Sequence, residues 1–165
     1  MSRPVRRMDR TVSALMDDMV DTMRAAPGIG LAAPQVGLEL RVIVAEVPLD
    51  PDDPDAGTRL FMVANPQIVW ASEALAEDQE GCLSVPELYG DVNRHVDVRV
   101  QGLNRKGRTE TFELSQLSAR VFQHEIDHLN GILFTDRVSG VDKLYHLEKD
   151  KDGNTVRVAY RVPIL

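Results

Sequence analysis

Apolar residues recur at helical spacing in two separate segments of the chain. The first covers about residues 9–25 and has its apolar positions at Val12, Leu15, Met16, Met19 and Met23. The second has them at Leu117, Val121, Ile126, Leu129 and Ile132. Because positions i, i+3, i+4 and i+7 share one face of a helix, each segment predicts a helix that packs one face into a core. The methionines of the first segment are most simply core residues.

Strand-like segments lie between these two helices. Apolar or alternating residues predict strands at 41–45, 61–69, 96–100 and 109–114, and residues 104–108 predict a hairpin turn between the last two. Near the C-terminus, Asp152-Gly153 precedes the strand-like residues 156–160, a pattern typical of a β-hairpin. We therefore expect an α+β fold in which antiparallel or mixed β-sheets wrap around the second helix.

The chain has 165 residues, which is about the size of one domain. The proline- and aspartate-rich segment 48–57 is expected to be a solvated loop, because the strands on its two sides need one another. We therefore expect residues 1–165 to form a single catalytic domain, with residues 139–165 as a divergent tail that contains the hairpin.

Charge and composition exclude several classes of protein. The net charge of −7 argues against nucleic-acid binding, and a single cysteine provides no disulfide framework. No run approaches the roughly 20 apolar residues of a membrane span. The basic start, residues 2–7, is soon followed by acidic residues and makes a poor signal peptide. These features predict a cytoplasmic protein.

Residues 124–128 read His-Glu-Ile-Asp-His and fall within the second predicted helix. Positions i and i+4 of a helix lie one above the other, so His124 and His128 can reach one metal ion. Glu125 lies about 100° round the helix axis, where its carboxylate can touch a water on that ion. The alternative, a chance pairing on a solvated helix face, is disfavoured by the apolar flanks. The segment therefore predicts metal-assisted hydrolysis.

A catalytic metal of this kind normally has three protein ligands, and the residues leave three sources for the third. In the protease pattern H-E-x-x-H-x-x-G-x-x-H, Gly131 fits, but Phe134 occupies the ligand position. Glu148 stands at a distance used by a second protease class, in a polar, turn-like context. The last candidate is Cys82, the only cysteine in the chain. A lone cysteine is usually a small buried hydrophobic residue. A thiolate together with two imidazoles, however, suits Zn²⁺ or Fe²⁺.

Three segments resemble the signature motifs of peptide deformylases, in the family's order and with similar spacing. They are Gly28-Ile29-Gly30-Leu31-Ala32-Ala33-Pro34-Gln35, Glu80-Gly81-Cys82-Leu83-Ser84 and Gln123-His124-Glu125-Ile126-Asp127-His128. The resemblance covers about residues 8–138 and includes Asn65-Pro66. It implies a hydrolase that removes the formyl group from N-formylmethionyl nascent chains and releases formate.

The first motif also matches a loose dinucleotide-binding pattern, Gly28-x-Gly30-x-x-Ala33. That pattern should follow a strand and open a helix, whereas here a predicted helix precedes it and Pro34 follows it. A plain structural loop is the other alternative.

The resemblance implies the catalytic parts of the site. Glu125 would move protons, while the Gln35 side chain and the backbone N–H of Leu83 would stabilise charge on the formyl oxygen. The implied metal ligands are Cys82, His124 and His128. The resemblance favours Fe²⁺ in the cell, with Zn²⁺, Ni²⁺ or Co²⁺ as ions that the same ligands accept.

Other residues are implied to contact the substrate or support the site. Ile29 and Gly30 would approach an extended peptide and shape the methionine pocket. Glu80 and Arg94 would pair and brace the cysteine segment. Tyr89 falls where many members of the family place an arginine that touches the bound peptide, so the resemblance does not define the outer substrate contacts.

Both ends depart from the family pattern. The first strand of most deformylases, with its Pro-Asp and Leu-Arg pattern, is not found, and residues 144–165 lack the basic helix that some members use to dock on the ribosome. A transient association with the ribosome is therefore expected only because the implied substrate is a nascent chain. Two other classes of function stay open: a metallopeptidase that uses Glu148 as its third ligand, and a non-enzymatic binding protein on a deformylase scaffold.

Overall fold

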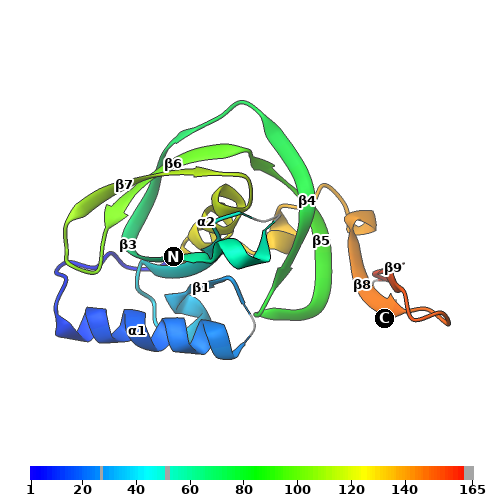
Figure 1. The fold of residues 1–165 in the computed structure, drawn as a ribbon, viewed down its shortest axis with the longest axis horizontal. Helices are drawn as coiled ribbons and strands as arrows, with labels where there is room; N and C mark the ends of the chain where they lie inside the picture. The colour runs from blue at the N-terminus through cyan, green and yellow to red at the C-terminus, as the bar shows by residue number, and fades with distance from the viewer. Residues whose placement is uncertain (27, 51–52, 162–165) are drawn as a thin grey trace.

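The computed structural model describes residues 1–26, 28–50 and 53–161, and within them the chain forms two α-helices and nine strands (Figure 1). The helices are α1 (Arg10–Ala25) and α2 (Gln116–Leu129). The strands are β1 (Gly30–Ala32), β2 (Val42–Pro48), β3 (Thr58–Ala71), β4 (Leu75–Cys82), β5 (Val85–His95), β6 (Asp97–Leu103), β7 (Thr109–Ser115), β8 (Leu144–Lys149) and β9 (Thr155–Ala159). Four 3-10 turns complete the described elements: η1 (Ala33–Val36), η2 (Pro54–Ala56), η3 (Phe134–Asp136) and η4 (Val141–Lys143).

The strands form two sheets that curve around α2. One sheet has the order β1-β2-β3-β6-β7 and the other β4-β5-β8-β9, and neighbouring strands in both are antiparallel. Figure 1 shows α2 enclosed by the curved strands, with α1 on the outside of the first sheet. The predicted α+β architecture around a central helix is confirmed.

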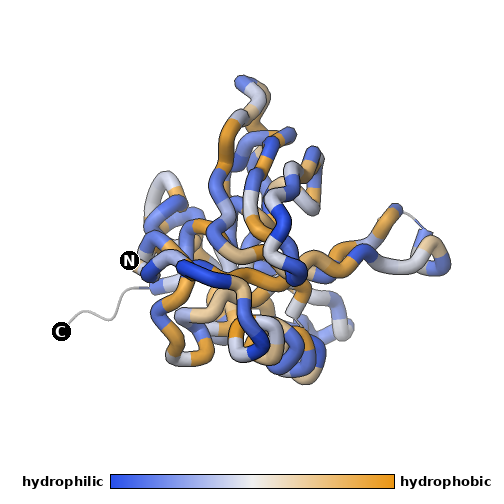
Figure 2. Tube along the Cα trace, turned by 90° about the vertical axis from the view of Figure 1, so that its left-hand side faces the viewer, coloured by the Kyte–Doolittle hydropathy of each residue, from blue (hydrophilic) through white to orange (hydrophobic). Residues whose placement is uncertain are grey.

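Strand β2 of the first sheet is buried on both faces, which explains its unbroken apolar run. Ile43 and Ala45 join the core cluster beneath α2, whereas Val42 and Val44 join a second cluster with α1. Residues alternate between the two sides of a strand, so both sides of β2 must be apolar. In β6 and β7 the buried and exposed positions alternate. Figure 2 shows hydrophobic and hydrophilic residues interleaved along the chain trace.

The first helix begins at a capping residue and packs its methionine face inward. The Asp9 side chain accepts a hydrogen bond of 3.0 Å from the Val12 N–H, as expected of an N-cap. Met16, Met19 and Met23 are fully buried or nearly so, which confirms their prediction as core residues.

The second helix is shorter than the apolar pattern predicts. It ends at Leu129; the N–H of Asn130 bonds back into the last turn, and Gly131 follows at a φ of +76°. A residue in the left-handed region after a helix ends it, so Ile132 lies beyond α2 and the expectation that it belongs to the helix is wrong.

Several strands run longer than predicted, and three (β1, β4 and β5) were not predicted at all. The turn at residues 104–108 joins β6 to β7 as expected, and β8 and β9 pair as a hairpin around Asp152-Gly153. Strands β4 and β5 carry the cysteine motif, so Cys82 is the last residue of a strand and not part of a longer loop. The expected acidic loop 48–57 lies between the paired strands β2 and β3; its residues 51–52, like residues 162–165 of the expected tail, lie outside the described residues.

Candidate metal centre and active site

The two histidines of α2 meet the cysteine at the end of β4. One ligand atom from each of Cys82, His124 and His128 lies within 4.8 Å of the others, and the Cys82 Sγ is 3.2 Å from the His128 Nε2. These are the atoms that the predicted metal site requires. The other candidate third ligand, Glu148, does not join them, because it lies on the exposed part of β8, paired with Val156. Phe134, which occupies the ligand position of the protease pattern, stacks on His124 as a buried ring.

The orientation of His124 is fixed by a carboxylate behind it. Its Nδ1 lies 2.8 Å from the Glu80 Oε2, so Nδ1–H donates to Glu80 and the other ring nitrogen is left for the metal site. The predicted pair of Glu80 and Arg94 is confirmed as a buried, two-pronged contact, with Nε–Oε1 at 2.9 Å and Nη2–Oε2 at 3.0 Å. This pair joins β4, the strand that carries Cys82, to β5, and Glu80 also connects β4 to α2 through His124.

Two more arginines and an aspartate extend this network, and sequence reasoning missed all three. Arg120 donates to the Glu80 Oε1 at 2.8 Å and to the carbonyls of Val92 and Ala76. Asp127 accepts from Arg94 at 2.5 Å and from Arg137 at 2.6 Å. The available signal was helical spacing, since Arg120 stands four residues before His124 and therefore on its face of the helix. Each buried charge in the network has an opposite charge beside it.

Burial and hydrogen bonds shift the pKa values around the centre in opposite directions. Burial alone would raise the pKa of the Cys82 thiol, but hydrogen bonds from His124, His128 and the Ser84 N–H lower it to about 5. Burial disfavours a charge on His124, yet its hydrogen bonds to Cys82 and Glu80 raise its pKa to about 10. Burial also opposes ionisation of Glu80, and its bonds to His124 and Arg94 bring that pKa down to about 2. The thiolate that metal binding needs is therefore already favoured.

Glu125 is buried beside the cluster without a hydrogen-bond partner for one oxygen. Among the described residues, the Glu125 Oε2 is the single buried side-chain nitrogen or oxygen atom without a hydrogen-bond partner. Burial raises the pKa of Glu125 to about 7, although the charges of His124 and His128 oppose the rise. A buried carboxyl with a free oxygen and a pKa near neutrality suits a general base.

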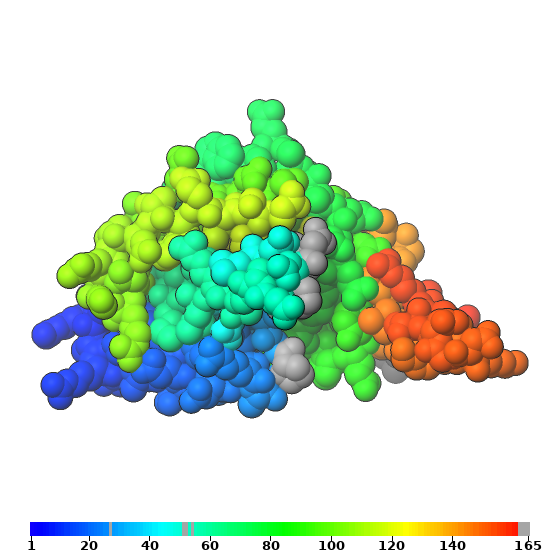
Figure 3. All heavy atoms as spheres, in the orientation of Figure 1, coloured from blue at the N-terminus to red at the C-terminus, as the bar shows by residue number. Residues whose placement is uncertain are grey.

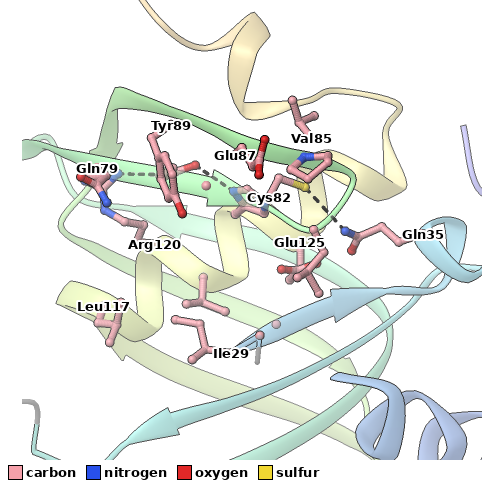
Figure 4. Close-up of a pocket in the computed structure, with 18 residues that line it drawn as sticks. Ile29, Gln35, Gln79, Cys82, Val85, Glu87, Tyr89, Leu117, Arg120 and Glu125 are labelled. Carbon is pink, nitrogen blue, oxygen red and sulfur yellow. Dashed lines mark hydrogen bonds and ion pairs between the residues drawn. The ribbon is translucent and has the colours of Figure 1, made fainter. Parts of the chain in front are cut away.

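Gln35, in the 3-10 turn η1, reaches the cluster with its amide orientation fixed. The Ala32 N–H donates to the Gln35 Oε1 at 2.8 Å, which turns Nε2 toward the site. Nε2 lies 3.1 Å from the Ser84 Oγ. It also lies 3.6 Å from the Cys82 Sγ (Figure 4). Leu83 follows Cys82 in the tight connection between β4 and β5, with an exposed side chain.

A pocket of about 460 Å³ opens over these groups. Ile29 and Gly30 line it from β1 and the residue before it, and Tyr89 lines it from β5. Leu117 and Val121 of α2, predicted as core residues, pack against the core and also line this pocket. Figure 4 shows Gln79, Tyr89, Glu87 and Cys82 along the wall formed by β4 and β5, with Ile29 and Leu117 across from them.

The residues present fit a divalent metal ion and a hydrolytic reaction. One thiolate and two imidazoles form a donor set for Zn²⁺ or Fe²⁺, and the unpartnered Glu125 oxygen is placed to accept a proton beside them. Fold and site together define a metal-dependent hydrolase with a mostly apolar substrate pocket. The chain matches the family described as polypeptide deformylase over residues 1–144, and it belongs to that family.

Relatives and solved structures agree with this assignment. The chain is 49% identical over 148 residues to a peptide deformylase of Methylocella silvestris, covering 90% of this chain and 75% of that one. The crystal structure of a probable peptide deformylase from Synechococcus phage S-SSM7 superposes with a TM-score of 0.75 at 43% identity, covering 82% of this chain and 89% of that chain. A class I type b peptide deformylase from Acinetobacter baumannii, solved with Met-Ala-Ser bound, gives a TM-score of 0.76 at 38% identity over 83% of this chain and 89% of that chain.

No helix among the described residues is both long enough and apolar enough to cross a membrane.

Proposed function

We propose that this chain removes the formyl group from the N-terminal formylmethionine of nascent polypeptides and releases formate. The observation that carries the proposal is the unpartnered Glu125 oxygen beside the group formed by Cys82, His124 and His128. Its family membership and a Met-Ala-Ser complex of a relative, which matches the expected product of such a reaction, support the choice of substrate.

Cys82, His124 and His128 would hold one divalent ion. When bound, that ion supplies a water activated at neutral pH and polarises the substrate carbonyl. We propose Fe²⁺ as the ion used in the cell, with Zn²⁺, Ni²⁺ or Co²⁺ as substitutes, because this mixed set of soft and borderline ligands accepts all of them.

The chain's own residues move the protons and stabilise the charge. The Glu125 carboxylate accepts a proton from the attacking water and delivers it to the leaving amine nitrogen, so the amide C–N bond breaks into formate and a free amino terminus. The Gln35 Nε2–H and the Leu83 N–H donate to the formyl oxygen as negative charge develops on it. Each such donor is worth roughly 3–4 kcal/mol of barrier when it is held in place beforehand.

The pocket and a free sheet edge provide the substrate contacts. The apolar side chains of Ile29, Leu117 and Val121 line a pocket that fits an unbranched methionine side chain. β1 is at the edge of its sheet, so Gly30 offers backbone groups to which an extended peptide can add as a further strand. Because the substrate is a nascent chain, we also propose a transient encounter with the ribosome, which cosedimentation with translating ribosomes tests.

Formate release from formyl-Met-Ala-Ser tests the proposal. The protein is loaded with Fe²⁺ or Ni²⁺ and compared with the Glu125→Ala and Cys82→Ala variants, with metal content measured for each. Release by the unmodified chain, lost in both variants, is the expected result. A folded, metal-loaded chain that releases no formate would contradict the proposal and favour the peptidase or the binding protein.

A further inference from the structure

The outer wall of the pocket is built on the C-terminal hairpin. Tyr89 lines the pocket, and it stands opposite Gly81 of β4 on one side and opposite Tyr145 of β8 on the other. A Cβ atom at Gly81 would lie 2.9 Å from the Tyr89 ring, so the ring packs directly against that glycine. The rings of Tyr89 and Tyr145 are stacked, with centroids 6.4 Å apart and planes 18° apart.

Tyr145 itself is held by contacts with three strands. It is 5% exposed, and its hydroxyl lies 2.9 Å from the Asp91 Oδ1 and 3.1 Å from the Oε1 of Gln79, a pocket residue. The Arg157 guanidinium lies 4.3 Å from the Tyr145 ring centroid and pairs with Asp91 at 2.9 Å. Figure 3 shows the orange and red C-terminal hairpin lying against the green residues of the β4 and β5 region.

A second tie runs from the hairpin to the rim of the pocket. The His146 Nδ1–H donates to the Glu87 carbonyl at 2.8 Å. Glu87 lines the pocket and has a φ of +64°, in the left-handed region that residues with side chains rarely adopt. A conformation of this kind persists where neighbouring contacts hold it, and His146 supplies such a contact.

We propose that the β8–β9 hairpin is a positioning element of the substrate site. Tyr145 and His146 fix Tyr89 and Glu87, and those two side chains meet the residues that follow the formylmethionine. This inference rests on the proposed function for the identity of the peptide. Because the metal ligands and the methionine pocket lie on other elements, loss of the hairpin contacts weakens binding of extended peptides and leaves binding of methionine alone unchanged.

Calorimetric titration of the Ni²⁺-loaded protein with Met-Ala-Ser and with methioninamide tests the proposal, and formate release is measured separately. Tyr145→Ala is expected to weaken Met-Ala-Ser binding about tenfold, the scale of a modest displacement of a binding group, and to leave methioninamide binding within twofold. In turnover, the same variant raises KM for formyl-Met-Ala-Ser with little change in kcat. His146→Ala, and Arg157→Ala at a more exposed residue, are expected to weaken Met-Ala-Ser binding by less than Tyr145→Ala does.

Lys143→Ala is the matched control. Lys143 joins the segment before β8 to Glu77 of β4 through an exposed ion pair at 2.7 Å, and Glu77 does not line the pocket, so both affinities should stay unchanged. Equal affinities in the folded Arg157→Ala, His146→Ala and unmodified proteins, or an equal loss for both ligands, would overturn the proposal. If the variants weaken binding of Met-Ala-Ser but not of methioninamide, and the unmodified protein releases no formate, then the proposed reaction is wrong and the positioning role of the hairpin still holds.

Discussion

Gly30 lies so close to the Glu125 side chain that a side chain at position 30 would have no room. A Cβ atom on Gly30 would lie 2.9 Å from the Glu125 Cδ and overlap its carboxylate oxygen. Strand β1 therefore forms one wall of the space that holds Glu125, and the missing side chain of Gly30 leaves room for the carboxylate.

Replacing Gly30 with alanine should displace the Glu125 carboxylate while the metal ligands stay in place. We expect kcat/KM to fall by roughly a hundredfold, because a general base that moves by about 1 Å loses its alignment. Gly28→Ala is the comparison: the tightest contact of its Cβ would be 3.0 Å to the Cδ1 of the flexible Leu83 side chain, and its other contacts would be 3.5 Å or longer, so its loss of activity should be smaller. Formate release and metal content are measured for both. Equal activity of Gly30→Ala and the unmodified chain would contradict the role given to this contact.

Metal content distinguishes the deformylase from the peptidase arrangement. Cys82→Ala should purify with much less bound metal, because it removes one of three clustered donors. Glu148→Ala should keep its metal, since Glu148 is exposed on β8 and outside the cluster. Elemental analysis by mass spectrometry after dialysis measures both, and the opposite pattern would favour the peptidase.

The Glu80 carboxylate serves both the fold and the metal centre. Glu80→Gln leaves Arg94 and Arg120 buried with less compensating charge and weakens the hold on His124. We expect a loss of about 3–5 kcal/mol in the free energy of unfolding and about 10–100-fold in metal affinity.

Glu113→Gln provides the surface control for this experiment. Glu113 pairs with Arg99 at 2.6 Å, but both side chains are about half exposed or more, so the loss should be about 0–1 kcal/mol. Denaturant unfolding and a competitive chelator titration give the two quantities. A Glu80→Gln variant that resembles Glu113→Gln in both would refute the supporting role.

Much of the site could be predicted because it depends on local spacing. His124, Glu125 and His128 share one turn of α2, so the sequence alone placed them together. The third ligand remained open without the family resemblance, since Cys82 reaches the histidines only through packing of the β4–β5 hairpin on α2.

Strands β4 and β5 of the second sheet were missed for a physical reason. β4 is an edge strand whose buried residue before the cysteine is Glu80, a charged group, so the strand lacks the alternating apolar residues by which strands are recognised. Arg120 and Asp127 were missed because a charge inside an apolar helix is understood only once its buried partners on β4 and β5 are seen.

Tyr89 gives the outer pocket a neutral aromatic surface. The lining includes the acidic residue Glu87, and the arginine of the lining, Arg120, is engaged by Glu80 and by backbone carbonyls. Tyr89→Arg should therefore raise kcat/KM for formyl-Met-Asp-Ser relative to formyl-Met-Lys-Ser by about fivefold, from roughly 1 kcal/mol of charge attraction in a solvated setting. Tyr89→Gln, which adds no charge, separates this effect from loss of the ring. If Tyr89→Arg leaves the ratio of the two kcat/KM values unchanged, the bound peptide does not contact the side of the pocket that Tyr89 lines.

Oxygen should inactivate the iron form through Cys82. Its low thiol pKa keeps the sulfur as a partly accessible thiolate, and a thiolate beside a redox-active ion is readily oxidised, whereas Zn²⁺ has no redox chemistry and Ni²⁺ resists oxidation by air. Activity of the Fe²⁺ form is therefore expected to decay in air and to persist without oxygen, while the Ni²⁺ form keeps its activity in both. Peptide mass spectrometry should find the added oxygen on the peptide that contains Cys82. An Fe²⁺ form that stays active through prolonged exposure to air would contradict this liability.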